Sequence, residues 1–134
     1  MKSLIYSSHA SEDTDLNVLV DILTIAKKKN EKHGITGMLI FDGKIFLHYI
    51  EGEPQKVDQL YHNIQHDSRH HSLKILGTRL HEYRLFKDWS MGYMNNSSQI
   101  LKTYEKITGR MEPDINALDY RQAQLLISNL SKIV

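Results

Sequence analysis

The dipeptide Asp42-Gly43 stands between two apolar runs and restricts the fold of this chain more than any other feature. An Asp-Gly pair in this setting is the strongest short-range signal of a β-hairpin. Residues 36–41 and 45–50 are therefore expected to pair as antiparallel strands, so that a sheet begins to form from neighbouring segments.

Side chains alternate between the two faces of a strand, and this alternation sorts the residues of the second hairpin strand. His48 should share a face with Phe46 and Ile50. Leu47 and Tyr49 should occupy the opposite face. The sequence thus predicts an imidazole on an otherwise apolar face of the sheet.

Other apolar patterns complete the order of elements. They predict strands over 3–8, 73–81 and 89–94, and helices over 14–30 and from Pro54 to about 65. The resulting order is β-α-β-β-α-β-β, which a split β-α-β sheet accommodates with both helices on one face. We therefore expect an α+β, ferredoxin-like fold, with Asn30 closing the first helix.

The last part of the chain has a different pattern. After residue 95 the apolar spacing becomes helical, breaks at Gly109 and Pro113, and resumes through Leu118 to Leu130. We expect two helices that cover the other face of the sheet. The predicted division is a domain over 1–95 and a C-terminal helical extension over 96–134.

Composition limits the classes of partner. The 134 residues suffice for one domain, and 17 Lys and Arg against 16 Asp and Glu leave a net charge of +1. No overall field therefore attracts nucleic acid or an anionic membrane. The chain has no cysteine, its apolar runs are too short to cross a bilayer, and its start lacks a secretion signal. These features predict a soluble, cytoplasmic protein.

Eight histidines raise the question of a metal site. His62 and His66 have the i, i+4 spacing of one helix face, and His70 and His71 follow shortly after. No HExxH pattern accompanies them, and a hydrophilic helix end explains them without a metal. We predict no metal site.

Patterns of catalytic residues are also missing from the sequence. There is no GxSxG segment, and Ser7 and Ser8 belong to a strand with no evident base beside them. Gly34 and Gly37 fall short of GxGxxG and precede a strand rather than a helix. The lysines at 27–29 are typical of a solvated helix end. We expect no enzyme activity.

Three polar residues occupy positions where a packed sheet and helix usually carry apolar ones: Tyr6, Asn30 and His48. In the predicted topology the first and third strands are neighbours, so Tyr6 and His48 could form a hydrogen bond while facing the two helices. The space between those helices is then a natural pocket. A core tyrosine with a histidine partner explains the same residues without a ligand.

Several motifs in the right order resemble the BLUF domains, bacterial sensors of blue light that use FAD. The resemblance covers residues 3–94 through the segments LIYSS, Asn30-x-x-x-GITG, FLHYIEGEP, DSRHHS and Phe86-x-x-W-S-M. It implies the same fold, with the flavin ring held between the two helices and FAD as the cofactor.

The resemblance also implies roles for residues around the ring. Asn30 matches the asparagine that holds the flavin's carbonyl and ring N–H edge, and Arg69 matches an arginine near the flavin edge or phosphates. Ile22 and Phe46 match apolar residues that pack near the ring. The remaining cofactor-binding assignments are Lys29 and His70.

The photoactive residues follow from the same resemblance. Tyr6 matches the tyrosine that gives an electron and then a proton to the excited flavin. Trp89 and Met91, which should alternate onto one face of the last strand, match the segment that changes conformation during signalling. Ser8 is assigned to the same relay.

At the position of the family's relay glutamine this chain has His48. An imidazole can bridge Tyr6 and the flavin, but it cannot reproduce the rotation of an amide or its imidic tautomer. The sequence therefore predicts an FAD-binding protein whose photocycle is weak, short-lived or absent. A light-insensitive flavin-binding or protein-interaction module is the alternative.

The resemblance finally implies how such a protein signals. Stand-alone members of the family associate with themselves and with separate signalling proteins, and the roughly 39 residues after residue 95 are too few for a cyclase or phosphodiesterase domain. We expect a homo-oligomer with a separate downstream partner, contacted through the C-terminal helices.

Overall fold

A computed structural model describes residues 1–12, 16–89 and 91–133. In these ranges the strands are β1 (Lys2–Ala10), β2 (Thr36–Phe41), β3 (Ile45–Gly52), β4 (His70–Leu80) and β5 (Gly92–Met94). The helices are α1 (Leu16–His33), α2 (Pro54–Gln65), α3 (Ser97–Thr108) and α4 (Tyr120–Ser131), with a 3₁₀ turn, η1, at Ile115–Ala117.

The strands form one mixed sheet in the order β4-β1-β3-β2-β5. β1 is antiparallel to both β3 and β4, β2 is antiparallel to β3, and β5 is parallel to β2. Two split units, β1-α1-β2 and β3-α2-β4, interleave in this order. The predicted ferredoxin-like α+β fold is confirmed.

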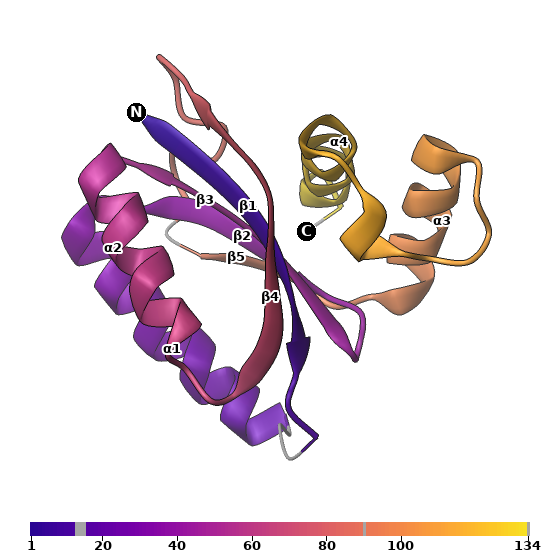
Figure 1. The fold of residues 1–134 in the computed structure, drawn as a ribbon, viewed down its shortest axis with the longest axis horizontal. Helices are drawn as coiled ribbons and strands as arrows, with labels where there is room; N and C mark the ends of the chain where they lie inside the picture. Colours follow the sequence, from indigo (N-terminus) through magenta and orange to yellow (C-terminus); the bar gives the residue numbers. More distant parts are fainter. Residues whose placement is uncertain (13–15, 90, 134) are drawn as a thin grey trace.

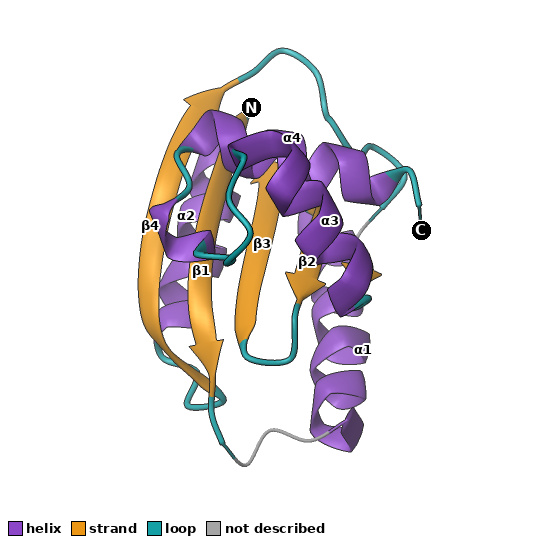
Figure 2. Ribbon diagram, turned by 90° about the vertical axis from the view of Figure 1, so that its right-hand side faces the viewer, coloured by secondary structure: helices purple, strands orange, loops and turns teal. Residues whose placement is uncertain are grey.

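Helices cover both faces of the sheet (Figure 1). α1 and α2 lie on one face, and α3, η1 and α4 lie on the other, as the view turned by 90° also shows (Figure 2). None of the helices in the described ranges combines the length and apolar composition needed to cross a bilayer. The two-sided arrangement matches the prediction.

The predicted hairpin of β2 and β3 is confirmed. Phe41 pairs with Phe46, and the Asp42 side chain accepts hydrogen bonds from the backbone N–H groups of Lys44 and Ile45 at 2.9 and 2.8 Å. Gly43 has a φ of +103°, a conformation that glycine adopts without steric cost. The turn therefore sets the register that places His48.

α1 ends later than predicted. Asn30 lies inside the helix, which continues to His33. Gly34, with a φ of +67°, donates to the Glu31 carbonyl, and the Ile35 N–H donates to the Asn30 carbonyl at 2.9 Å. This is the Schellman pattern, in which a left-handed glycine closes the helix. The prediction that Asn30 closes it was wrong because Gly34 does. The predicted start at residue 14 lies outside the described residues.

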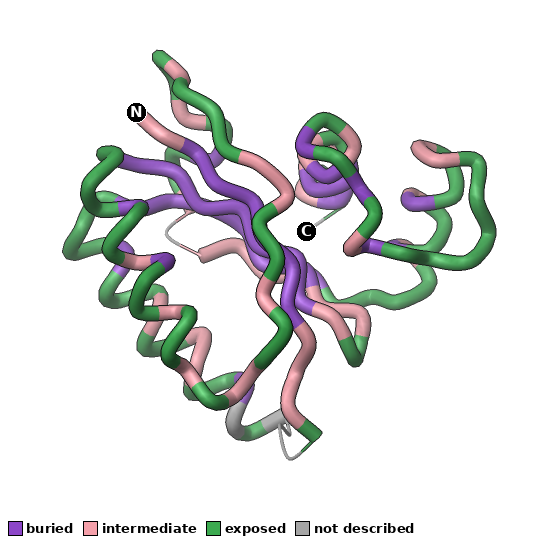
Figure 3. The backbone as a smooth tube through the Cα atoms, viewed as in Figure 1, coloured by how far each residue is buried: buried purple, intermediate pink, exposed green. Residues whose placement is uncertain are grey.

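Two strand predictions also shift. β4 begins at His70 rather than at 73, and β5 is confined to Gly92–Met94 rather than extending from 89. The central strands are buried, whereas β4, at the edge of the sheet, is largely exposed (Figure 3).

The core is divided by the sheet. Leu47 and Tyr49 of β3 belong to a large cluster with residues of α3 and α4, whereas Phe46 and Ile50 belong to smaller clusters beneath α1 and α2. The predicted alternation along β3 is confirmed. His48 therefore faces the α1 and α2 side.

α4 is anchored to the sheet by Tyr120. Its ring lies over Gly77 of β4, where an added Cβ would be 2.8 Å from the Tyr120 Cβ. The Tyr120 hydroxyl is 2.6 Å from Ser3 Oγ of β1, and the Arg79 guanidinium lies 4.5 Å from the ring centroid. An Asp119 capping box starts the helix. The C-terminal layer is thus attached to the sheet by specific contacts.

Candidate functional site

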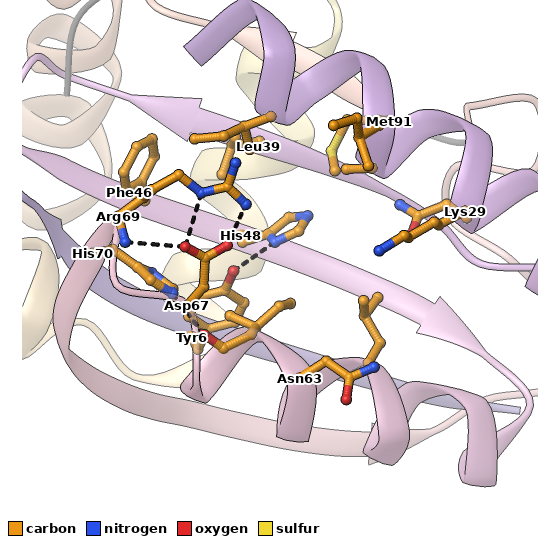
Figure 4. A pocket seen from close by; sticks show the side chains of 16 residues that line it. Tyr6, Lys29, Leu39, Phe46, His48, Asn63, Asp67, Arg69, His70 and Met91 are labelled. Atoms are coloured by element: carbon orange, nitrogen blue, oxygen red, sulfur yellow. Dashed lines mark hydrogen bonds and ion pairs between the residues drawn. The ribbon is translucent and has the colours of Figure 1, made fainter. Parts of the chain in front are cut away.

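A cavity of about 220 Å³ lies between the sheet and helices α1 and α2 (Figure 4). The sheet contributes Tyr6, Leu39, Phe46 and His48 to its wall. Most of the lining surface is apolar, with polar groups concentrated in a few side chains. A planar, largely apolar ring with polar edges suits such a cavity.

Tyr6 and His48 form a hydrogen-bonded pair in this wall. They are directly paired in the antiparallel ladder of β1 and β3, and the Tyr6 hydroxyl lies 2.8 Å from His48 Nδ1. Their rings pack edge to face with centroids 5.3 Å apart. The predicted hydrogen bond is confirmed, because residues opposite each other in a ladder point to the same face.

Burial keeps both members of the pair neutral. Burial raises the pKa of Tyr6 well above its usual value, and the nearby Tyr61 and Asp67 raise it further. Burial also lowers the pKa of His48 to about 3, with a further contribution from His70. A neutral phenol and a neutral imidazole therefore meet in the cavity wall at neutral pH.

One ring nitrogen of His48 is left for a ligand. Nε2 is buried and has no hydrogen-bond partner among the described residues. Buried polar atoms are nearly always paired, so an unpaired one in a cavity wall indicates a missing partner. A heteroaromatic ring that bears polar atoms on its edge fits this position.

Asp67 and Arg69 form the charged part of the cavity wall, at the turn after α2. The Arg69 guanidinium donates to Asp67 through Nε at 2.8 Å and through Nη2, and its backbone N–H also donates at 3.0 Å. The hydrogen bond from Arg69 lowers the pKa of the Asp67 carboxyl, and this effect outweighs the opposing effect of burial.

His70 lines the cavity and connects three elements. Its Nδ1 lies 2.8 Å from Ser8 Oγ of β1, and its Nε2 lies 2.8 Å from the Ile64 carbonyl of α2. The Tyr6 ring packs against it with centroids 6.4 Å apart. His70 therefore holds β1, β4 and α2 together beside the Tyr6 ring.

A family model described as "BLUF: Sensors of blue-light using FAD" matches residues 1–92. The chain belongs to the BLUF family. Over 73 residues it is 32% identical to the blue light- and temperature-regulated antirepressor BluF of Escherichia coli (strain K12), a match that covers 54% of this chain and 18% of that protein. The chain therefore spans less than a fifth of that curated relative.

Solved structures agree with this assignment. The structure described as the BlsA photo-activated state has a TM-score of 0.88 and 30% identity, covering 96% of this chain and 93% of that one. A bacterial light-regulated adenylyl cyclase has a TM-score of 0.69 and 35% identity, covering 70% of this chain and 28% of that one. The BlsA match extends across the C-terminal helices, whereas the cyclase match covers less of the chain.

The cavity gathers nine of the eleven residues that the sequence singled out for a BLUF site. They are Tyr6, Ile22, Lys29, Asn30, Phe46, His48, Arg69, His70 and Met91. Ser8 lies behind the wall, buried and bonded to His70. The residues therefore converge although they come from β1, α1, β3, the start of β4 and the segments that precede β4 and β5.

Trp89 does not join the BLUF cavity. It stacks on Phe86 with centroids 5.5 Å apart and packs against the cluster that contains α3 and α4, whereas Met91 lines the cavity on the other face. The prediction that Trp89 and Met91 share a face was wrong. β5 begins only at Gly92, so strand alternation does not extend back to these residues.

Sequence reasoning missed Asp67 and Asn63, both of which line the cavity. Asn63 neighbours Leu60 and Ile64 on α2, and the apolar stripe of that helix could have indicated which face it shares. Asp67 precedes Arg69 by two residues in a turn. An acid so close to a candidate cofactor-binding arginine is the signal that could have identified their pairing.

The histidines do not assemble a metal centre in the described part of the chain. No group of three or more His, Cys, Asp or Glu side chains there has an arrangement that could hold a metal ion. The His62 and His66 rings lie 4.7 Å apart, and His66 Nδ1 bonds to the His62 carbonyl. The bond from His66 to the His62 carbonyl is one that caps the C-terminal end of α2.

Proposed function

We propose that this protein binds FAD between α1 and α2 and acts as a blue-light receptor without enzyme activity, with a photocycle altered by His48. The observation that carries the proposal is the buried Tyr6–His48 pair, whose Nε2 is unpartnered in the wall of the cavity. Family membership supports a flavin, and the apolar cavity supports a ring-shaped ligand.

The lining residues divide into three groups. Ile22, Phe46 and Leu39 would pack against the ring faces. Asn30, Arg69 and Lys29 would hold its polar edges and charged tail, and His70, whose two ring nitrogens are already bonded, would add a ring surface to the wall. Tyr6, His48 and Met91 would form the photoactive side, supported from behind by Ser8 through His70.

A bound flavin supplies blue-light absorption and an acceptor for an electron. Tyr6 is suited to donate that electron, because its phenol is buried and its hydroxyl proton can pass along the bond to His48 Nδ1. The pocket excludes water at this point, since Tyr6 and His48 are each 4% exposed. Proton transfer is therefore confined to the pair.

His48 should shorten or abolish the long-lived response. An amide can rotate to exchange its donor and acceptor, and it can form an imidic tautomer. The imidazole of His48 is restrained by its bond and edge-to-face packing with Tyr6, and neither change is open to it. Any light-induced rearrangement then returns rapidly to its starting hydrogen bonds.

We place the output in the C-terminal helices. Residues 1–95 would form the flavin-binding unit and residues 96–134 the extension that contacts a separate signalling protein or a second copy. The likeness to an antirepressor favours a protein partner over nucleic acid or membrane. Exposed Leu101, Met111 and Leu125 provide apolar surface on this layer. A cytoplasmic location accompanies this proposal.

A light-insensitive module with the same fold is the second candidate. His48 is the observation that favours it, because the residue replaces the amide on which the family's response depends. Such a module would still bind flavin or a protein partner. The two candidates differ in whether light changes the protein.

The absorption spectrum before and after blue illumination tests the proposal. The purified protein should show flavin absorbance, with a red shift that is absent or decays quickly. His48→Gln should acquire a long-lived red shift. His33→Gln, at an exposed position on α1, is the matched control and should behave as the original.

Each result has a separate meaning. A colourless protein that takes up no FAD contradicts the flavin site. A long-lived red shift in the original protein contradicts the role given to His48. A His48→Gln protein that binds FAD but stays unresponsive to light also contradicts the role given to His48. An original protein that binds FAD but shows no light-dependent change in spectrum, size or partner binding favours the light-insensitive module.

A further inference from the structure

The proton on the His48 imidazole has one position that satisfies the buried pair. If Nε2 carries it, the Tyr6 O–H donates to Nδ1 and both groups are paired. If Nδ1 carries it, Nδ1 donates to the phenol oxygen and the phenolic hydrogen has no acceptor among the described residues. The Nδ1 tautomer therefore leaves two buried groups unpaired, the phenolic hydrogen and the Nε2 lone pair, whereas the Nε2 tautomer leaves only the Nε2–H. Each unpaired buried group is unfavourable, so the Nε2 tautomer prevails.

This arrangement makes Nε2 a hydrogen-bond donor. Nε2 is buried, has no partner among the described residues, and belongs to a residue that lines the cavity. The ring is restrained at 67° to the Tyr6 ring, and rotating it would break the 2.8 Å bond. The donor therefore keeps one position and cannot become an acceptor without a change of tautomer.

We infer that His48 is a specificity-determining residue whose Nε2–H selects a ligand ring with an acceptor edge, and so favours oxidised over reduced flavin. The inference rests on the proposed function in taking the ligand to be a flavin. Oxidised flavin presents an unprotonated ring nitrogen and a carbonyl on one edge. Two-electron reduction places hydrogen on that nitrogen, and two donors then face each other.

A glutamine at this position would not discriminate in this way. Its amide carries a donor and an acceptor, and rotation lets it meet either form of the ring. Sites built around a hydrogen bond reject ligands that cannot complete it, because a buried group is left unpaired. His48→Gln should therefore lose the selectivity and keep the cavity.

The midpoint potential of the bound FAD measures this selectivity. We expect the original protein to favour oxidised over reduced FAD about tenfold more than His48→Gln does. For a two-electron couple this ratio places the original midpoint potential about 30 mV below that of the variant. His33→Gln should match the original protein. Equal potentials, or a higher one in the original, would overturn the inference.

Nitrogen-15 NMR of the histidine rings tests the tautomer directly. The spectrum should show His48 protonated at Nε2 and unprotonated at Nδ1, with His48→Gln used to assign the signals. Protonation at Nδ1 in a protein that binds FAD overturns the inference and leaves the proposed function standing. Failure to bind FAD in either redox state overturns both.

Discussion

His48 shows how far one residue's surroundings determine its chemistry. It is 4% exposed, bonded to Tyr6, and close to His70. Desolvation opposes its protonation, and a second imidazole nearby opposes it further. A histidine is usually a pH sensor near neutrality, but this one stays neutral through the whole physiological range.

The low pKa of His48 predicts acid sensitivity of the fold. Its pKa is about 3 in the folded protein and near 6.5 in the unfolded chain. Between these values the unfolded chain binds a proton that the folded protein does not. The contribution of His48 to the free energy of unfolding should therefore fall by about 1.4 kcal/mol for each unit by which the pH decreases between these two pKa values.

Denaturant unfolding of the original protein and of His48→Gln from pH 7 to pH 4 measures this effect. The difference between the two free energies of unfolding should change with pH, because the other titrating groups are common to both proteins. His33→Gln removes an exposed histidine and should leave the pH dependence of the original unaltered. A pH-independent difference would show that His48 titrates normally.

At the scale of elements, Glu51 connects the end of β3 to the loop between β4 and β5. Its carboxylate is fully buried and accepts from the backbone N–H groups of Leu85 and Phe86 at 2.7 Å each. Thr36 Oγ1 and the Tyr49 hydroxyl donate to it at 2.9 and 3.1 Å. This loop leads to Trp89, so Glu51 positions the segment between the cavity and the C-terminal layer.

Glu51→Gln should destabilise the protein by about 1–3 kcal/mol, because an amide NH₂ would meet donors that now meet a carboxylate oxygen. Denaturant unfolding measures the change, and the single tryptophan, Trp89, reports on the loop through its fluorescence. Glu82→Gln, at an exposed position of the same loop, should change neither. Unaltered stability and fluorescence in Glu51→Gln would contradict the proposal that Glu51 holds this loop against β3.

At the scale of the whole molecule, the sheet and the C-terminal layer share one core. Ile5, Met38 and Leu47 of the sheet lie in the same buried cluster as Leu126 and Ile127 of α4, and each is fully buried. Polar contacts add to this interface, since Ser7 Oγ donates to Asn116 Oδ1 at 2.5 Å. The layer therefore covers an apolar face that the other two helices do not reach.

Removal of residues 96–134 should prevent stable folding of residues 1–95 alone. Exposing one fully buried apolar side chain on this face lowers the free energy of unfolding by about 1.5–3 kcal/mol. Exposing several of them costs as much as the usual stability of a whole domain, about 5–15 kcal/mol. Size-exclusion chromatography and binding of a hydrophobic dye would show aggregation or exposed apolar surface. A soluble, folded monomer that binds no dye would contradict this expectation.

The sequence by itself determined the order of elements, the β2–β3 hairpin and the face on which Tyr6 and His48 meet. These features depend on local patterns: a turn dipeptide, the period of two in strands and the period of 3.6 in helices. The same patterns determined which strand residues face the cavity, because residues on one face of adjacent strands must point to the same side, whereas the helix and loop residues of its wall were assigned through the resemblance to BLUF domains.

Only the tertiary structure decided which face Trp89 occupies, how Asp67 pairs with Arg69 and what the Glu51 carboxylate holds. Trp89 lies before β5, where the chain follows no regular period. Glu51 meets backbone groups 34 and 35 residues away, a distance along the chain over which no local pattern operates. Such contacts depend on how loops return to the sheet, and that path is set by the packing of the whole molecule.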